Sequence, residues 1–210
     1  MGSFELATPL AIKAELEKLP IPDGPNEGGL ITWYPWREYL AHRLAMSKQC
    51  RIFEDRFVGK TSTLAALAYC AIHPAGLFTK PGGKVLMGFH AQSGVEIAME
   101  FLRYYLRGDC FDDDGKVMDS SVGKWRVIQN THRVSIMHRD SDAEVELKTF
   151  GAWDEARKRE TRGEPSITPW LALLDEPGSL SQALYGRFYH ELCMHMDVHN
   201  KPRIVEIGTL

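Results

Sequence analysis

Residues 53–63 read FEDRFVGKTST, and their end matches the phosphate-binding loop pattern G-x-x-x-x-G-K-[ST], with Glu54 in place of the first glycine. Residues 50–53, CRIF, predict a short buried strand before the loop, and residues 62–72 are rich in helix formers. At such a strand–loop–helix turn, backbone N–H groups and the helix N-terminus converge on an anion. The stretch therefore predicts an α/β fold with a phosphate site, although Gly-Lys-Thr by itself also fits an ordinary turn.

Phosphate chemistry gives the residues of this loop distinct expected roles. Lys60 would neutralise the β- and γ-phosphates of a nucleotide, and the Thr61 hydroxyl would be a ligand of Mg²⁺. Val58, Gly59 and Ser62 complete the expected set of nucleotide contacts. The loop is therefore a candidate site for a nucleotide with its magnesium ion.

A second candidate motif lies far downstream, at the end of another apolar segment. Residues 171–174 lead into Asp175 and Glu176, and such a strand delivers both carboxylates to the carboxyl edge of a parallel sheet. Asp175 would hold Mg²⁺ through water, and Glu176 would orient or deprotonate the attacking water. Taken alone, the pair also fits strand-end charges before Pro177. The two motifs in this order favour phosphoryl transfer, which needs both.

The rest of the chain alternates between helical and extended patterns. Helices are expected over residues 11–18, 36–47, 92–106 and 180–198. Strands are expected over residues 84–89, 170–174 and 203–207. Such alternation is typical of a mostly parallel sheet with helices on both faces. Residues 125–128, 133–137 and 144–147 predict an antiparallel β-meander, and the polar alternation of its last two segments predicts one solvated face.

Composition limits the function classes that fit the chain. With 210 residues and 44% hydrophobic content, the chain can bury one sizeable core. The balance of 25 Lys+Arg against 28 Asp+Glu gives a formal charge of -3, so any contact with DNA must be local. The 4 cysteines are widely spaced, which argues against a zinc ribbon or a dense disulfide framework. No apolar run approaches the roughly 18 residues of a membrane span, so we expect a soluble protein that stays inside the cell that makes it.

These motifs resemble those of the large terminase subunits of tailed bacteriophages, the ATPases that pump genomic DNA into capsids. That family tends to show R-x-x-G-K-[ST] without the leading glycine, which is matched by residues 56–61, and a strand that ends in Asp-Glu, matched by residues 175–176. An Arg-Gly shortly before that strand is matched by residues 162–163, and the family's coupling motif by residues 208–209. An aromatic adenine-binding segment before the loop is matched by residues 34–37, YPWR.

The resemblance implies roles for further residues. Arg56 would stabilise the charge on the γ-phosphate within the same subunit, and Arg162 is the candidate that a neighbouring subunit would supply. Trp36 and Arg37 would contact the nucleotide base. Gly208 and Thr209 would couple hydrolysis to movement. The resemblance also implies ATP and Mg²⁺ as cofactors. The implied fold is a P-loop NTPase of the ASCE type, with a mostly parallel central sheet, flanking helices and the antiparallel meander as an insertion.

Two departures from the family pattern affect these expectations. Arg37 stands where the family usually has Gln, so an adenine-specific pair of hydrogen bonds is doubtful and the choice of nucleotide stays open. Glu54 and Asp55 place two carboxylates beside the phosphates, which should weaken binding unless they point away or pair with Arg51 or Arg56.

The leading hypothesis is an ATP-hydrolysing motor domain of a phage large terminase, which translocates double-stranded DNA into the procapsid. We expect an N-terminal helix and loop over residues 1–30, the ATPase domain over residues 31–210 and no C-terminal nuclease domain. The implied partners are double-stranded DNA, the portal protein and the small terminase subunit, in the host cell cytoplasm and away from membranes. The protein would be a monomer in solution and a ring on the portal. The alternatives are a helicase-like nucleic-acid translocase and a non-hydrolysing nucleotide-binding assembly module.

Overall fold

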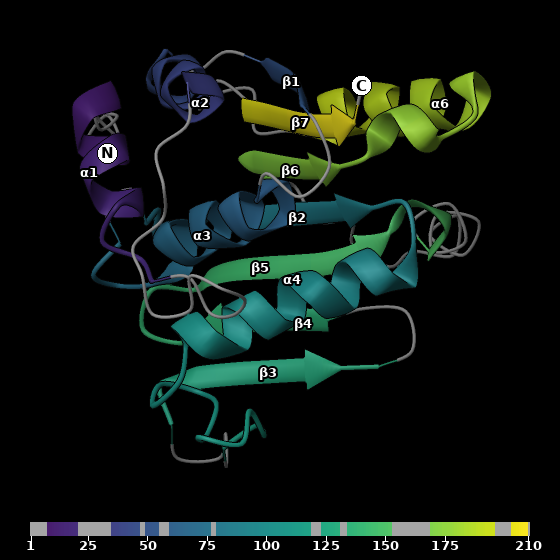
Figure 1. Ribbon diagram of the computed structural model, residues 1–210. Helices are drawn as coiled ribbons and strands as arrows, with labels where there is room; N and C mark the ends of the chain where they lie inside the picture. Colours follow the sequence, from purple (N-terminus) through teal and green to yellow (C-terminus); the bar gives the residue numbers. More distant parts are fainter. Residues whose placement is uncertain are drawn as a thin grey trace.

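A computed structural model describes most of the chain, namely residues 8–20, 35–46, 49–54, 59–76, 79–118, 123–130, 134–152, 169–195 and 203–209. The described helices are α1 (Pro9–Leu16), α2 (Pro35–Ala45), α3 (Lys60–Ile72), α4 (Gln92–Tyr105) and α6 (Gln182–His195) (Figure 1). The described strands are β1 (Cys50–Glu54), β2 (Lys84–Phe89), β3 (Trp125–Gln129), β4 (Val134–His138), β5 (Ala143–Thr149), β6 (Leu171–Asp175) and β7 (Arg203–Thr209). Every helix and strand expected from the sequence is present, with ends shifted by a few residues.

The strands form one 7-stranded sheet in the order β1-β7-β6-β2-β5-β4-β3. Strands β1, β7, β6, β2 and β5 are parallel, and β4 is antiparallel to both of its neighbours. The mostly parallel sheet and the antiparallel meander are therefore confirmed. The meander extends the central sheet directly, because β5 pairs in parallel with β2. A single strand, β7, separates β1 from β6, so the two candidate motifs lie close together.

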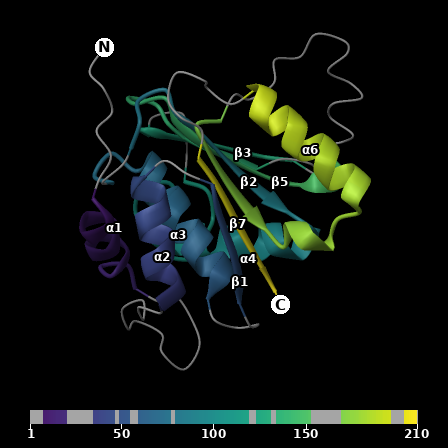
Figure 2. The same cartoon turned by 90° about the horizontal axis from the view of Figure 1, so that it is seen from above.

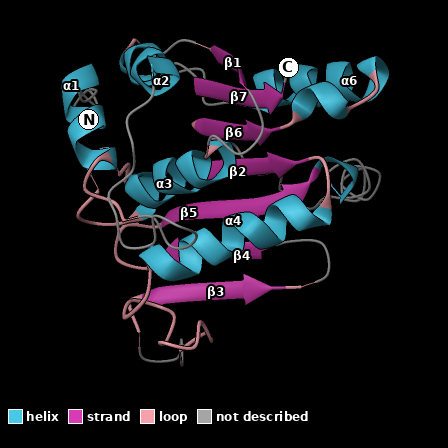
Figure 3. Cartoon of the chain, in the orientation of Figure 1, coloured by secondary structure: helices cyan, strands magenta, loops and turns pink. Residues whose placement is uncertain are grey.

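Helices cover both faces of this sheet (Figure 3). Seen from above, α1, α2, α3 and α4 lie on one face and α6 lies on the other (Figure 2). The larger core packs under α1 to α4, while a smaller core joins Phe188 and Leu192 of α6 to Leu174 and Ile204 of the sheet. None of the helices in the described residues is long and apolar enough to cross a lipid bilayer.

Helix α3 is the most deeply buried helix described, and its sequence explains both its burial and its end. Its alanines and leucines form helix readily, and nearly all of residues 63–72 are buried against the sheet and α4. The helix ends at Ile72, where His73 takes an extended conformation with φ -74° and ψ 133°. The residue before a proline is driven out of the helical region, which is the expected effect of Pro74.

The expectation that one face of the meander is solvated is wrong. Ser135, Glu144 and Glu146 all point to the polar side of β4 and β5, yet all three are buried. Glu144 lies 2.9 Å from Lys84 and accepts a hydrogen bond from the Ser135 hydroxyl, and Glu146 lies 3.0 Å from Lys148. Alternation in the sequence shows that the two faces of a strand differ in polarity, and it does not show that the polar face is exposed to water. Charged side chains can be buried where neighbouring side chains pair with them.

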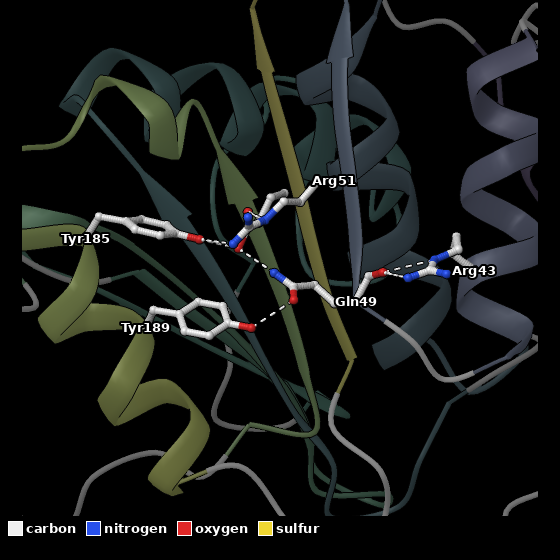
Figure 4. Close-up of polar contacts among 6 residues, drawn as sticks. Arg43, Gln49, Arg51, Tyr185 and Tyr189 are labelled. Atoms are coloured by element: carbon white, nitrogen blue, oxygen red, sulfur yellow. Dashed lines mark hydrogen bonds and ion pairs between the residues drawn. The ribbon is translucent and has the colours of Figure 1, made fainter. Parts of the chain in front are cut away.

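A polar network ties α6 to the edge of the sheet (Figure 4). Glu206 of β7, whose side chain is buried, lies 2.7 Å from the Arg51 Nε of β1. The Tyr185 hydroxyl of α6 donates to Glu206 at 2.7 Å and accepts from Arg51 at 2.9 Å. Gln49 donates to Glu206 and accepts from the Tyr189 hydroxyl of α6. Two tyrosines one turn apart on α6 therefore fix this helix to β1 and β7.

Replacing Tyr185 with Phe should destabilise the protein by about 2 kcal/mol, because hydrogen bonds to charged groups contribute about 1.5–3 kcal/mol. The substitution removes the hydroxyl that joins Arg51 to Glu206 and keeps the ring. Urea denaturation measures the change. Tyr39→Phe is the matched control, because Tyr39 is 49% exposed and its loss of a hydroxyl should change stability by less than about 0.5 kcal/mol. Equal stabilities of the two variants would show that the network does not hold α6.

Candidate active site

The carboxyl ends of β1, β7, β6 and β2 meet at one edge of the sheet, because these strands are parallel. A cavity of about 1020 Å³ lies at this edge. Its lining includes the described residues of both candidate motifs and of the expected coupling motif, namely Gly59, Lys60, Thr61, Ser62, Asp175, Glu176, Gly208 and Thr209. The structure thus brings together three segments that lie far apart in the sequence.

Lys60 is the first residue of α3, and its side chain extends toward the ends of β1 and β7. Its Nζ donates to the Glu54 carbonyl at 2.8 Å, the Gly208 carbonyl at 3.1 Å and the Thr209 hydroxyl at 2.9 Å. The same atom lies 3.5 Å from the Glu176 carboxylate. Only 8% of the Lys60 side chain is exposed, so these contacts replace the water that its charge would otherwise bind. The Lys60 ammonium group therefore places a positive charge at the cavity.

Thr61 and Asp175 place two side-chain oxygens next to each other in the cavity. The Thr61 hydroxyl donates to the Asp175 carboxylate at 2.7 Å. Burial raises the pKa of Asp175, and the hydrogen bond from Thr61 offsets part of that effect. A hydroxyl and a carboxylate are hard ligands that suit Mg²⁺, and a bound cation would favour the charged form of Asp175.

The chemistry of this pair therefore fits a magnesium ion that is shared with phosphate. Across the described parts of the chain, no group of three or more His, Cys, Asp and Glu residues could hold a metal by itself. Magnesium commonly binds through one or two protein ligands, with waters and substrate phosphates completing its shell. Thr61 and Asp175 are the residues that would hold it here.

Glu176 has an unusual backbone conformation at the end of β6. Its φ of 53° and ψ of 43° lie in the left-handed region, which non-glycine residues seldom occupy. The conformation is fixed because the Glu176 N–H donates to Ile207 at 2.8 Å, while its carboxylate accepts from the Thr209 N–H at 2.9 Å and from the Thr209 hydroxyl. Strained residues of this kind cluster at functional sites.

The two neighbouring carboxyl groups have opposite pKa shifts. Burial by itself would raise the pKa of Glu176, but the hydrogen bonds from Thr209 and the charge of Lys60 outweigh it and lower the pKa. Asp175, which is more deeply buried, has a raised pKa. Environments that separate the pKa values of adjacent carboxyl groups are typical of acid–base sites. Glu176 is therefore ionised at neutral pH and able to accept a proton.

One wall of the cavity was not anticipated from the sequence. It comes from the end of β2 and from α4, and includes Phe89, His90, Ile97 and Phe101. The sequence could have indicated this wall, because residues that directly follow a predicted parallel strand lie at the same sheet edge as the ends of the other parallel strands. This wall adds apolar side chains to the lining of the cavity.

Trp36 and Arg37 lie in the first turn of α2 and are buried. The described residues that line the cavity do not include them. The Arg37 Nε donates to the Thr63 hydroxyl at 3.0 Å, and its Nη2 donates to the Gly59 carbonyl at 3.4 Å. Arg37 thus contacts Gly59 and the first turn of α3, and it does not line the cavity.

Other candidate residues lie outside the described part of the chain. These are Asp55, Arg56, Val58, Arg162 and Gly163. Arg51, a possible partner of the carboxylates at Glu54 and Asp55, binds Glu206 and Tyr185 in the structure. Glu54 contributes its backbone carbonyl to Lys60.

Comparison with known proteins identifies the fold. No protein-family model and no curated protein matches the sequence. The crystal structure of the HK97 bacteriophage large terminase superposes with a TM-score of 0.63 and 14% identity, over 97% of this chain and 38% of that one. A mutant ATPase domain of the Thermus phage P74-26 large terminase superposes with a TM-score of 0.51 and 12% identity, over 84% of this chain and 64% of that one.

The chain has the fold of a phage large terminase ATPase domain. At these identities the likeness concerns the fold alone, and the chain spans well under half of the HK97 protein's length.

Replacing Gly59 with Ala should destabilise the protein by more than replacing Gly82 with Ala. Both glycines have positive φ, 76° and 66°, so each alanine meets the left-handed penalty of about 1–2 kcal/mol. A Cβ at Gly59 would also lie 2.7 Å from the Arg37 Nη2, whereas nothing lies within 4 Å of a Cβ at Gly82. Chemical denaturation of both variants measures the difference. Equal losses would indicate that Arg37 moves aside at no cost.

Proposed function

We propose that the chain is the ATP-hydrolysing motor domain of a phage large terminase, which drives double-stranded DNA into the procapsid. One observation carries the proposal. Lys60, the Thr61–Asp175 pair and Glu176 lie together in a cavity at the strand ends of a terminase-like fold. Each of these groups has a chemical role in phosphoryl transfer.

In this proposal the triphosphate lies at the N-terminus of α3. The first N–H groups of the helix and the Lys60 ammonium would bind the β- and γ-phosphates, as expected at a helix N-terminus. Thr61 and Asp175 would hold Mg²⁺, which supplies charge neutralisation on the phosphate oxygens when bound. Val58, Gly59 and Ser62 complete the proposed contacts of the loop. ATP as the nucleotide is a prediction from the resemblance, and selectivity for ATP over other nucleotides stays open.

Glu176 would act as the general base. Its carboxylate is ionised at neutral pH, and in this proposal it orients a water molecule beside the γ-phosphate or accepts a proton from it. Arg56 of the same subunit and Arg162 of a neighbouring subunit are the proposed sources of positive charge for the transition state. The proposed partners are DNA, the portal protein and the small terminase subunit. In a ring on the portal, an arginine that reaches the site of the next subunit would link the hydrolysis cycles of the two subunits.

Coupling would begin at Gly208 and Thr209. The end of β7 is bound by both catalytic groups, since Lys60 contacts Gly208 and Thr209, and Glu176 accepts two hydrogen bonds from Thr209. A γ-phosphate would attract the Lys60 ammonium and repel the Glu176 carboxylate, and both effects would alter these bonds. Binding and hydrolysis would thereby change the position of the end of β7 and of the chain that follows it.

The first test compares the wild type with Lys60→Ala and Glu176→Gln in an ATPase assay with Mg²⁺. Lys60→Ala should weaken ATP binding and abolish turnover, whereas Glu176→Gln should bind ATP normally and lose about 10²–10⁴-fold in kcat, as expected for a general base. Lys116→Ala is the control, because Lys116 is exposed and lies outside the cavity. Equal turnover in all four proteins would refute hydrolysis at this site and favour a non-hydrolysing module.

The motor role requires a second measurement with DNA and portal protein. Linear double-stranded DNA and purified portal should raise the ATPase rate of the wild type several-fold and leave Lys60→Ala and Glu176→Gln inactive. Single-stranded DNA of equal length is the control. Stimulation by single strands in place of duplex would favour a helicase-like translocase, and indifference to duplex DNA and portal together would contradict the packaging role.

A further inference from the structure

The carbonyl oxygen of Gly59 is surrounded by an unusual number of hydrogen-bond donors. It accepts from the Thr63 N–H at 3.1 Å, which is the ordinary helical hydrogen bond. It also accepts from the Thr63 hydroxyl at 2.7 Å, the Ser62 hydroxyl at 2.9 Å and the Arg37 Nη2 at 3.4 Å. A carbonyl oxygen has two lone pairs, so these donors fix its direction more firmly than the first turn of a helix requires.

The direction of this carbonyl determines where the next N–H points. The peptide that joins Gly59 to Lys60 is planar and trans, so its C=O and N–H point in opposite directions. Because the C=O is turned toward Thr63 and Arg37, the Lys60 N–H is turned the other way, and both Gly59 and Lys60 line the cavity. The first N–H groups of a helix are the ones that bind an anion.

Arg37 holds this peptide from a different helix. The guanidinium group is buried, lies 4.9 Å from the Trp36 ring and donates its Nε to the Thr63 hydroxyl at 3.0 Å. It occupies the space beside Gly59, since a Cβ there would lie 2.7 Å from its Nη2. Arginine presents donors in a rigid planar fork, which suits contact with Thr63 and Gly59 together.

We propose that Arg37 is a positioning residue for the triphosphate. Together with Thr63 it holds the peptide between Gly59 and Lys60 with its N–H toward the phosphates, and so it sets the affinity for the triphosphate of any nucleotide without reading the base. The inference rests on the proposed function, because it presupposes phosphates in the cavity. It differs from the base contact that the family resemblance implies for Arg37.

Binding of ATP, GTP and inorganic tripolyphosphate to the whole chain tests this role by isothermal titration calorimetry. The variants are Arg37→Ala, Arg37→Lys, Thr63→Val and Thr63→Ser, with Lys60→Ala as the reference for loss of phosphate contact. Arg37→Ala and Thr63→Val should weaken all three ligands by the same factor, about tenfold, as expected when a hydrogen bond to a charged group is lost. Thr63→Ser keeps the hydroxyl and should bind like the wild type, while Arg37→Lys should fall between, because it keeps the charge and loses the fork.

Several outcomes would overturn the inference. If Arg37→Ala changes the ratio of ATP to GTP affinity and leaves tripolyphosphate binding unchanged, Arg37 reads the base. If folded Thr63→Val binds tripolyphosphate as tightly as Thr63→Ser, the hydrogen bonds of the Thr63 hydroxyl do not position the loop. This comparison can be made even where Arg37→Ala fails to fold. Failure of the wild type to bind any of the three ligands would overturn the proposed nucleotide site and, with it, the role of Arg37.

Discussion

The geometry of the cavity depends on the hydrogen bonds of the buried Lys60 ammonium group. A charge with so little exposure is stable only where polar groups surround it, and these groups come from strands that are distant in sequence. Glu54 and Thr209 are paired across β1 and β7, so the parallel register places the Glu54 carbonyl and the Thr209 hydroxyl on either side of Lys60. A shift of β7 by one residue in this register would turn the Thr209 side chain to the other face of the sheet.

The end of β6 shows how one backbone turn gives two adjacent carboxyl groups different chemistry. Asp175 remains in the strand and faces Thr61, where burial raises its pKa. Glu176 enters the left-handed region and turns to Thr209, where hydrogen bonds and the charge of Lys60 lower its pKa. The two carboxyl groups therefore differ in how readily they hold a proton, although they are adjacent in the chain. The strained conformation is stable because Ile207 and Thr209 supply its partners.

Strand β7 connects the cavity to the opposite face of the sheet. Its last residues bind Lys60 and Glu176, while Glu206, two residues before Gly208, binds Arg51 and the Tyr185 hydroxyl under α6. Figure 4 shows this second group of contacts, and Figure 2 shows that α6 lies across the sheet from α2 and α3. Arg37 thus contacts Gly59 on one face of the sheet, and α6 is bound to β7 on the other.

The sequence by itself determined the kind of fold and the two motifs, because both are local properties. Alternating apolar patterns predicted the strands and helices, and the positions of Lys60, Thr61, Asp175 and Glu176 after predicted strands indicated one sheet edge. The antiparallel meander was also evident, although the burial of its polar side was not. The roles of Arg56, Val58 and Arg162 remain predictions from the resemblance.

Only the tertiary structure decided which groups meet. The partners of Lys60, the apolar wall from α4 and the contact of Arg37 with Gly59 depend on strand register and helix packing between residues far apart in the chain. The same holds for Glu144 and Glu146, whose burial follows from paired lysines on β2 and β5. Periodicity reports which face of an element a residue occupies, whereas the free energy of burying a charge depends on the groups that the fold brings to it.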